Sequence, residues 1–262
     1  MRFRSPGIFI SAVIKPLGLA VIFLLSCPTD FSSEKYRGEI VFREEVSATR
    51  RDELARRLRV ITGWRDLTFD SDGRLQIGTT PADNGSKQAR TLIAETISGG
   101  KILVLEDASN RPDVVFAQVI PGRWKSHAAD QPAVFVVLID FADFDHLMGD
   151  RQALEAFDVG WGLLHEIDHV VNDSSDADRL GRTGECETHI NQMRRECNLP
   201  QRTEYLSTFF PHAEESTFKT RLVRLAFEQE DSVMKKLRRY WLIWDATQVG
   251  GLDSAKEIAE AR

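Results

Sequence analysis

The stretch GWGLLHEIDHVVND, residues 160–173, sets two histidines, a glutamate and an aspartate into an otherwise apolar run. Apolar residues recur at helical spacing before it, which predicts one helix over residues 150–172. This stripe consists of Leu154, Phe157, Trp161 and Leu164. The same face continues to His165 and Asp168, with His169 beside them. Because burying polar groups without partners is costly, we expect something to satisfy these side chains.

The central five residues form the pattern HExxH. His165 and His169 lie four positions apart, so a helix presents both imidazoles on one face, where they can converge on one metal ion. Glu166 is rotated by about 100° from His165 and can reach a water on that metal without binding the metal itself. The pattern is short, so the case for a metal depends on finding a third ligand.

Two arrangements of a third zinc ligand are considered. Metzincins place a histidine or aspartate six positions after the second histidine, but that position is Ser175, and Asn172 replaces the family's glycine. Gluzincins place a glutamate on the following helix. Glu187 fits this second arrangement, since it lies 187 − 169 = 18 positions after His169 on a predicted helix over 185–197.

Other residues of the same helix are alternatives to Glu187. Glu185 is the main competitor, but it lies at the helix start, where acidic residues are common for electrostatic reasons. Cys186 and His189 are weaker candidates. We therefore expect Glu187 to be the third ligand and leave Glu185 open.

Three segments carry a resemblance to a known group: HEIDH at 165–169, GECETHINQMRREC at 184–197 and LPQRTEY at 199–205. Together they resemble gluzincin-type HExxH metallopeptidases, particularly metallopeptidase domains of bacterial secreted effectors and Rhs-associated toxins. The resemblance covers residues 165–205. It implies that His165, His169 and Glu187 bind Zn²⁺, that Glu166 acts as general base and acid, and that Tyr205 approaches the site.

Asp168 departs from this pattern, because most zincins have a small or uncharged residue there. We weigh three interpretations of it. Its carboxylate bonds to Arg194 or Arg195 of the next helix, it orients a histidine, or it marks a degenerate motif.

The surrounding segments predict an α+β fold. Strands are expected at 36–42, 101–107, 113–120 and 133–141, with helices at 48–63 and 87–100 and a hairpin around Asp72-Gly73. We expect a zincin-like, twisted mixed sheet packed on the active-site helix, with the 185–197 helix crossing beneath. A β-hairpin follows from residues 218–229 and 235–249, with a helix over 216–240 as the alternative. The strand at 133–141 or 113–120 would accept a peptide as an added antiparallel strand.

The N-terminus predicts export. Basic residues precede a ten-residue apolar run, PLGLAVIFLL, which is typical of a signal peptide over residues 1–26. The sequence LLSC at 24–27 also resembles a bacterial lipobox, in which Cys27 would be lipidated and attach the protein to a membrane. The alternative is an ordinary secretory signal cut nearby. In either case we expect a single domain over 27–262 that is periplasmic, anchored in the outer membrane or extracellular.

Composition limits the partners. A net charge of −6 over 262 residues gives no reason to expect nucleic acid, so we expect none. Cys186 and Cys197 lie 11 positions apart on one predicted helix, about 16 Å, which is too far for a disulfide.

The sequence therefore predicts a zinc metallopeptidase acting on a protein or peptide. Zn²⁺ would activate a water, and Glu166 would move its proton to the leaving amine. One alternative is a secreted or lipid-anchored binding protein, in which the helix holds a structural zinc or pairs its acidic groups with arginines. Another is a hydrolase of non-peptide amides with the same residues.

Overall fold

The computed structural model describes residues 37–80, 84–122, 132–179, 181–209, 221–231 and 233–250. The chain from Lys35 onward forms one compact unit by its internal contacts. The predicted signal peptide over residues 1–26 and the predicted lipidation of Cys27 lie outside the described residues.

The first sheet has four strands in the order β1-β4-β6-β5. Their bounds are Glu39–Phe42 for β1, Lys101–Asp107 for β4, Ala117–Pro121 for β5 and Ala133–Ile139 for β6. β1, β4 and β6 run parallel, and β5 pairs antiparallel with β6. The predicted mixed sheet is confirmed. Of the two candidates for the edge strand beside the helix, β5 lies at the edge and β6 lies inside the sheet, so the 133–141 candidate is wrong.

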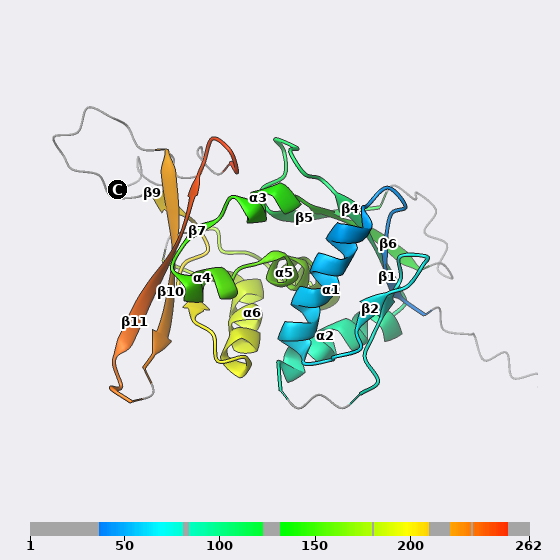
Figure 1. Cartoon of the computed structure of the whole chain (residues 1–262), viewed down its shortest axis with the longest axis horizontal. Coiled ribbons are helices and arrows are strands. Elements are labelled where there is room, and N and C mark those ends of the chain that lie inside the picture. The colour runs from blue at the N-terminus through cyan, green and yellow to red at the C-terminus, as the bar shows by residue number, and fades with distance from the viewer. Residues whose placement is uncertain are drawn as a thin grey trace, which may run out of the picture. The chain divides into compact units, whose positions relative to one another are not determined.

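Three helices pack with this sheet (Figure 1). They are α1 at Ala48–Thr62, α2 at Lys87–Ser98 and α5 at Val159–Asn172. A small hairpin of β2 (Thr68–Phe69) and β3 (Leu75–Gln76) lies beside α1 and β1. The apolar stripe of α5 is buried as its spacing predicts, because Trp161, Leu164 and Ile167 are at most 2% exposed within the main core. HExxH therefore lies on a helix fixed by its own apolar face.

The predicted single helix over 150–172 is two helices. α4 spans Arg151–Glu155 and α5 begins at Val159. The break has a local cause: the carboxylate of Asp158 accepts the N–H groups of Gly160 and Trp161, which caps a new helix start. The apolar spacing continues across the break, so periodicity alone could not reveal it.

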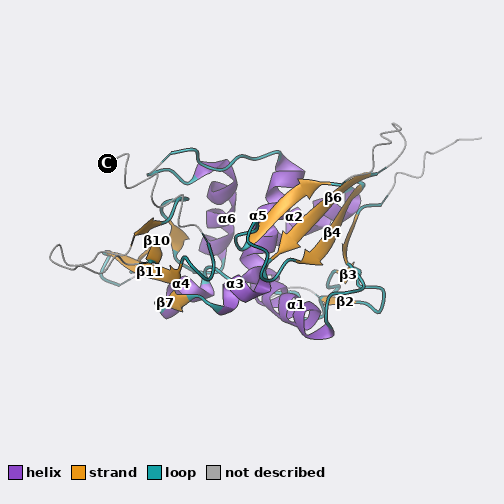
Figure 2. Ribbon diagram, turned by 90° about the horizontal axis from the view of Figure 1, so that it is seen from above, coloured by secondary structure: helices purple, strands orange, loops and turns teal. Residues whose placement is uncertain are grey.

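The C-terminal half of the described chain supplies a helix and a second sheet. α6 spans Gly184–Glu196 and contacts α5. The sheet has the order β7-β11-β10-β8, and β9 also pairs with β10. Its bounds are Met148–Gly149 for β7, Gln201–Arg202 for β8, Thr208–Phe209 for β9, Leu222–Glu230 for β10 and Leu237–Asp245 for β11. The predicted hairpin is confirmed over the alternative helix, and Figure 2 shows α5 and α6 between the two sheets.

No helix among the described residues has the length and apolar character needed to cross a membrane. The α+β class is confirmed, and so is the absence of a disulfide between Cys186 and Cys197, which are both free thiols.

A buried acidic pair fixes the start of β5. The short helix α3 (Phe141–Asp145) begins after β6, and Asp140 caps it by accepting the N–H of Asp143. The carboxylate of Asp143 in turn accepts the N–H of Phe116 at 2.8 Å. Phe116 has φ of 63°, an uncommon conformation for a bulky residue, so this contact holds a strained position. The turn also shortens the predicted strand 113–120 to one that begins at Ala117.

Asp143 makes stability depend on pH. Burial, with a smaller contribution from Asp140, raises the pKa of Asp143 from 3.8 to about 7. The folded protein holds this proton more tightly than the unfolded chain, so the contribution to stability is present at low pH and is lost as pH rises through about 7. Asparagine can still accept the Phe116 N–H but cannot ionise.

We predict that Asp143→Asn gains about 1–2 kcal/mol of unfolding free energy relative to wild type between about pH 5 and pH 8. Urea unfolding at several pH values measures this difference. Parallel stability curves for the two proteins would show that Asp143 does not titrate in this range.

Candidate metal centre

α5 brings the two histidines of HExxH together as predicted. The ring centroids of His165 and His169 lie 4.7 Å apart and nearly perpendicular. Both rings turn their Nε2 atoms toward a third residue, Asp176. His165 Nε2 lies 3.1 Å from Asp176 Oδ1, and His169 Nε2 lies 3.4 Å from Asp176 Oδ2. Two imidazole nitrogens and a carboxylate thus converge on one point.

Asp176 has the character of a metal ligand. Its Oδ1 is buried and has no hydrogen-bond partner, because the nearby His165 Nε2 meets the distance but not the geometry of a hydrogen bond. Burial acts to raise the pKa of Asp176, but the two histidines outweigh burial and hold its pKa well below the usual range. An ionised carboxylate with an unsatisfied oxygen beside two imidazoles fits a metal ion.

The loop after α5 delivers Asp176. The helix ends at Asn172, and the next residue, Asp173, turns the chain back with a left-handed φ of 53°. The carbonyl of Ser174 accepts a hydrogen bond from His169 Nδ1 at 2.8 Å, which leaves Nε2 to face Asp176. The carbonyl of Ser175 accepts the N–H groups of Glu185 and Cys186 at the start of α6. The loop is therefore held at both ends, by α5 and by α6.

Asp168 anchors the same turn. Its side chain is fully buried, and it accepts hydrogen bonds from Asn172 at 2.6 Å, Ser174 at 2.6 Å and His189 at 2.9 Å. It bonds to neither Arg194 nor Arg195, so that interpretation of Asp168 is wrong. The carboxylate instead ties the end of α5 and the loop to α6, which explains a charge in an apolar helix.

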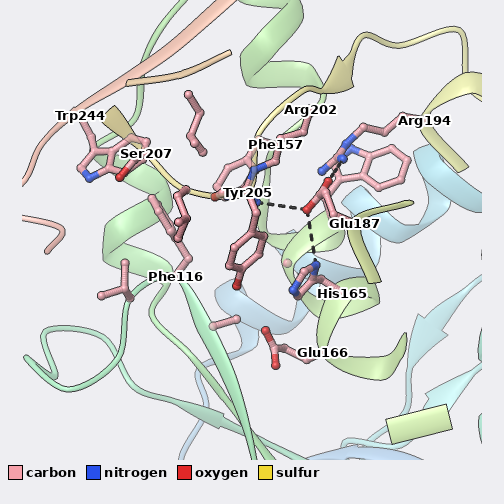
Figure 3. A pocket seen from close by; sticks show the side chains of 16 residues that line it. Phe116, Phe157, His165, Glu166, Glu187, Arg194, Arg202, Tyr205, Ser207 and Trp244 are labelled. Carbon is pink, nitrogen blue, oxygen red and sulfur yellow. Dashed lines mark hydrogen bonds and ion pairs between the residues drawn. The ribbon is translucent and has the colours of Figure 1, made fainter. Parts of the chain in front are cut away.

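Our sequence prediction required Glu187 at this point, but the structure does not place it there. Both oxygens of Glu187 are held by arginines: Oε1 accepts from Arg194, and Oε2 lies 3.1 Å from Arg202 Nη1. Burial acts to raise the pKa of Glu187, but Arg194 and Arg202 lower it to about 2. Oε2 lies 3.6 Å from His165 Nδ1, on the side of the ring away from Asp176. Figure 3 shows these contacts as dashed lines.

Glu187 therefore supports His165 from behind, and Glu185 is exposed on the surface. Asp176 takes the third place in the candidate group. It lies seven positions after His169, one more than the metzincin spacing that we tested. The sequence signal for Asp176 was an acidic residue shortly after the motif. The sequence analysis missed Asp176 because it lies in a loop, where no periodic spacing of residues indicates which side chain returns to the helix.

Cys186 is the fourth member of the group that could hold a metal ion, with His165, His169 and Asp176. Its Sγ lies 3.3 Å from His165 Nδ1 and 3.4 Å from the carbonyl oxygen of His165. Burial, with the nearby Asp168, raises the pKa of this thiol far above its usual range. It faces Nδ1 rather than the Nε2 side that Asp176 occupies, so it belongs to the support of His165.

Glu166 lies beside the two histidines and is 7% exposed. Its Oε2 accepts the N–H of Val119 on the edge strand β5 at 2.8 Å. Burial raises the pKa of Glu166, against the opposing effect of the two histidines. A carboxylate with a raised pKa, fixed at the side of a metal group, is suited to accept and return a proton.

Tyr205 lies next to the candidate metal group, as the resemblance implied. Its hydroxyl donates to Asp176 Oδ2 at 2.7 Å, and its ring stacks on His165 with centroids 5.9 Å apart. The guanidinium of Arg202 lies 4.7 Å from the Tyr205 ring centre and also bonds its carbonyl. Tyr205 thus links Asp176 to the buried charges around Glu187.

A cavity of about 240 Å³ opens beside His165 and Glu166. Figure 3 shows it running from these two residues and Tyr205 toward Phe116, Ser207 and Trp244. It leaves open space beside the candidate metal group.

No family model, curated protein or solved structure matches this chain. The geometry of His165, His169, Asp176 and Cys186 could hold a metal ion.

Removing the charge of Glu187 tests its role. Glu187→Gln leaves Arg194 and Arg202 buried without a counter-charge, so we expect a loss of about 3–5 kcal/mol in unfolding free energy. Chemical denaturation measures this loss. Glu185→Gln on the exposed side of the same helix is the matched control and should change stability by less than about 0.5 kcal/mol. Equal effects of the two substitutions would contradict a buried ion-pair role for Glu187.

Proposed function

We propose that this protein is a zinc-dependent metallopeptidase in which His165, His169 and Asp176 bind Zn²⁺. The observation that carries the proposal is the unsatisfied carboxylate oxygen of Asp176 beside the two imidazole Nε2 atoms. Two imidazoles and a carboxylate form a three-ligand set that zinc hydrolases use, with one position left open. The zincin-like arrangement is supported by HExxH on a buried helix beneath an antiparallel edge strand.

Each side chain has a distinct task in this proposal. Zn²⁺, when bound, supplies a Lewis acid for the scissile carbonyl and lowers the pKa of a water. Glu166 would take a proton from a water at the site and deliver it to the leaving amine. The Ser174 carbonyl fixes the tautomer of His169, since Nδ1 donates to it and Nε2 remains free to bind metal. The thiol of Cys186 and the carboxylate of Glu187 position His165 from its Nδ1 side.

The substrate is a protein or peptide, which would reach the site along the edge strand β5. Export of the protein, and attachment of Cys27 to a membrane, remain proposals from the sequence.

A structural zinc is the second candidate function, favoured by the presence of Cys186 in the group. A closed site would need Cys186 as a thiolate beside His165, His169 and Asp176. The Sγ atom of Cys186 lies at the Nδ1 side of His165 and contacts the His165 carbonyl, which favours the open site.

Metal binding tests the ligand assignment. We predict that Asp176→Ala weakens zinc binding by more than about 100-fold, because it removes a direct ligand. Titration of metal-free protein with zinc against a competing chelator measures this affinity. Asp178→Ala, an exposed acid in the same loop, is the matched control and should bind zinc as wild type does. Equal affinities of the two variants would contradict Asp176 as a ligand.

Turnover tests the role of Glu166. Glu166→Gln can still accept the Val119 N–H but cannot take a proton, so we expect unchanged zinc content and a fall in kcat of about 10²–10⁴-fold. Cleavage of a peptide library by the two proteins measures the loss, with Glu45→Gln on the surface as the control. Full activity of Glu166→Gln would overturn the mechanism.

A further inference from the structure

The turn between β10 and β11 presents apolar side chains to solvent. Val233 is 87% exposed, Met234 50% and Leu237 65%. They are three of the six large apolar side chains that are exposed in the described part of the chain, and they lie within five positions of one another. Single exposed apolar residues are common on soluble proteins, but a cluster of them marks an interaction site. Figure 1 shows this turn at the lower end of the hairpin.

The same turn is basic. Residues 233–239 read VMKKLRR, with three apolar residues, four basic residues and no acidic one. All seven are exposed. The whole chain, by contrast, has a net charge of −6. A basic segment on an otherwise acidic protein is attracted to a negatively charged partner.

The two arginines of this segment are paired within the hairpin. Arg238 Nη2 lies 3.1 Å from Asp231 Oδ2, and Arg239 Nε donates to Glu228 Oε1 at 2.7 Å. Glu228 and Arg239 are also directly opposite each other on β10 and β11. These pairs support the base of the hairpin, so the two arginines are partly neutralised there.

The two lysines carry the charge of the turn itself. Lys235 Nζ lies 3.8 Å from Glu230, but the two side chains are 74% and 61% exposed, so water and salt screen this contact. Lys236 forms no ion pair with any residue that the structure describes. Both ammonium groups are therefore available to an external anion.

Backbone contacts fix the shape of the turn. Asp231 Oδ1 accepts the N–H groups of Val233 at 3.0 Å and Met234 at 2.9 Å. Lys235 has a left-handed φ of 52°, and its N–H donates to the Asp231 carbonyl at 2.9 Å. Because the turn is already folded, a partner does not have to order it, and less conformational entropy is lost on binding.

We infer that this turn binds the surface of an anionic phospholipid bilayer. Lipid matches both of its properties, since the acyl boundary accepts the three apolar side chains and the phosphate groups meet the two lysines. The end of a hairpin enters a fluid layer without needing a complementary groove. A nucleic acid offers phosphates but no apolar layer. The inference depends neither on the proposed function nor on lipidation of Cys27.

Hydrogen–deuterium exchange of the full chain with lipid vesicles tests this inference at the turn itself. A local readout is needed, because the apolar run at 16–25 is itself able to bind lipid. Vesicles made of equal parts phosphatidylglycerol and phosphatidylcholine should slow exchange of the N–H groups at 233–239 by at least about threefold. Pure phosphatidylcholine should not slow it, and about 0.5 M salt should remove the effect of the anionic vesicles.

Charge reversal tests the role of the lysines. Lys235→Glu combined with Lys236→Glu should abolish the slowing by anionic vesicles, because it replaces attraction by repulsion. Both positions are exposed, so this variant should keep the wild-type midpoint of urea unfolding. Arg56→Glu, on the exposed side of α1, is the matched control and should leave the slowing unchanged.

The apolar side chains are tested separately. Val233→Ser combined with Leu237→Ser should also abolish the slowing, because serine gains little from the acyl boundary. Val60→Ser is the matched control, since Val60 is 71% exposed on α1, and it should behave as wild type.

Several results would overturn the inference. They are unchanged exchange at 233–239 with anionic vesicles, equal slowing by pure phosphatidylcholine, and slowing that persists in both substituted hairpins. Inorganic phosphate that slows exchange as strongly as the vesicles would show a site for a free anion instead. A single-stranded oligonucleotide that slows exchange equally in wild type and in the serine variant would show a nucleic-acid surface instead.

Discussion

The carboxylate of Asp176 between two imidazole Nε2 atoms is the contact on which the rest of the site depends. The helix α5 can place His165 and His169, but it ends before it can supply a third ligand. The chain must therefore reverse within a few residues and return a carboxylate to the helix it has just left. The left-handed residue Asp173 and the bonds made by Asp168 to Asn172 and Ser174 provide this reversal.

A second constraint acts from the other side of His165. Glu187 is 1% exposed and neutralises two buried arginines, which in turn reach the carbonyl of Ala156 and the backbone around Tyr205. Removing one partner of such a buried ion-pair network costs stability, because it leaves the other charge buried and unpaired. The network therefore holds α6 against α5 and the strand β8. The same residues line the inner end of the cavity. One buried charge cluster thus supports His165, a candidate metal ligand, and shapes the space beside it.

The sequence was sufficient where periodicity or turn chemistry carries the signal. Helical spacing located α5, apolar runs located β4 and β6, and alternation of residues located β10 of the C-terminal hairpin. The cap contact of Asp158 divides the expected helix in two. The apolar stripe continues across this break, so helical spacing does not reveal it. The left-handed conformation of Phe116 shortens the expected strand. Such a conformation at a bulky residue has no sequence signature, so the sequence does not predict it.

The sequence predicted the helical residues of the candidate site but not the residue from the loop. His165, Glu166 and His169 follow from spacing on one helix. Asp176 lies where we expected Glu187, and this placement depends on tertiary contacts. Glu187 faces two arginines that become its neighbours only when β8 packs against α6. The short loop that begins at Asp173 brings Asp176 back, and no helical or strand period describes that path.

X-ray absorption at the zinc edge reports the atoms bound to the metal in the zinc-loaded protein. We predict nitrogen and oxygen neighbours at about 2.0–2.2 Å and no sulfur, as expected for His165, His169, Asp176 and a water. A sulfur neighbour at about 2.3 Å would place Cys186 on the metal. That result would contradict the open catalytic site and establish a closed structural one.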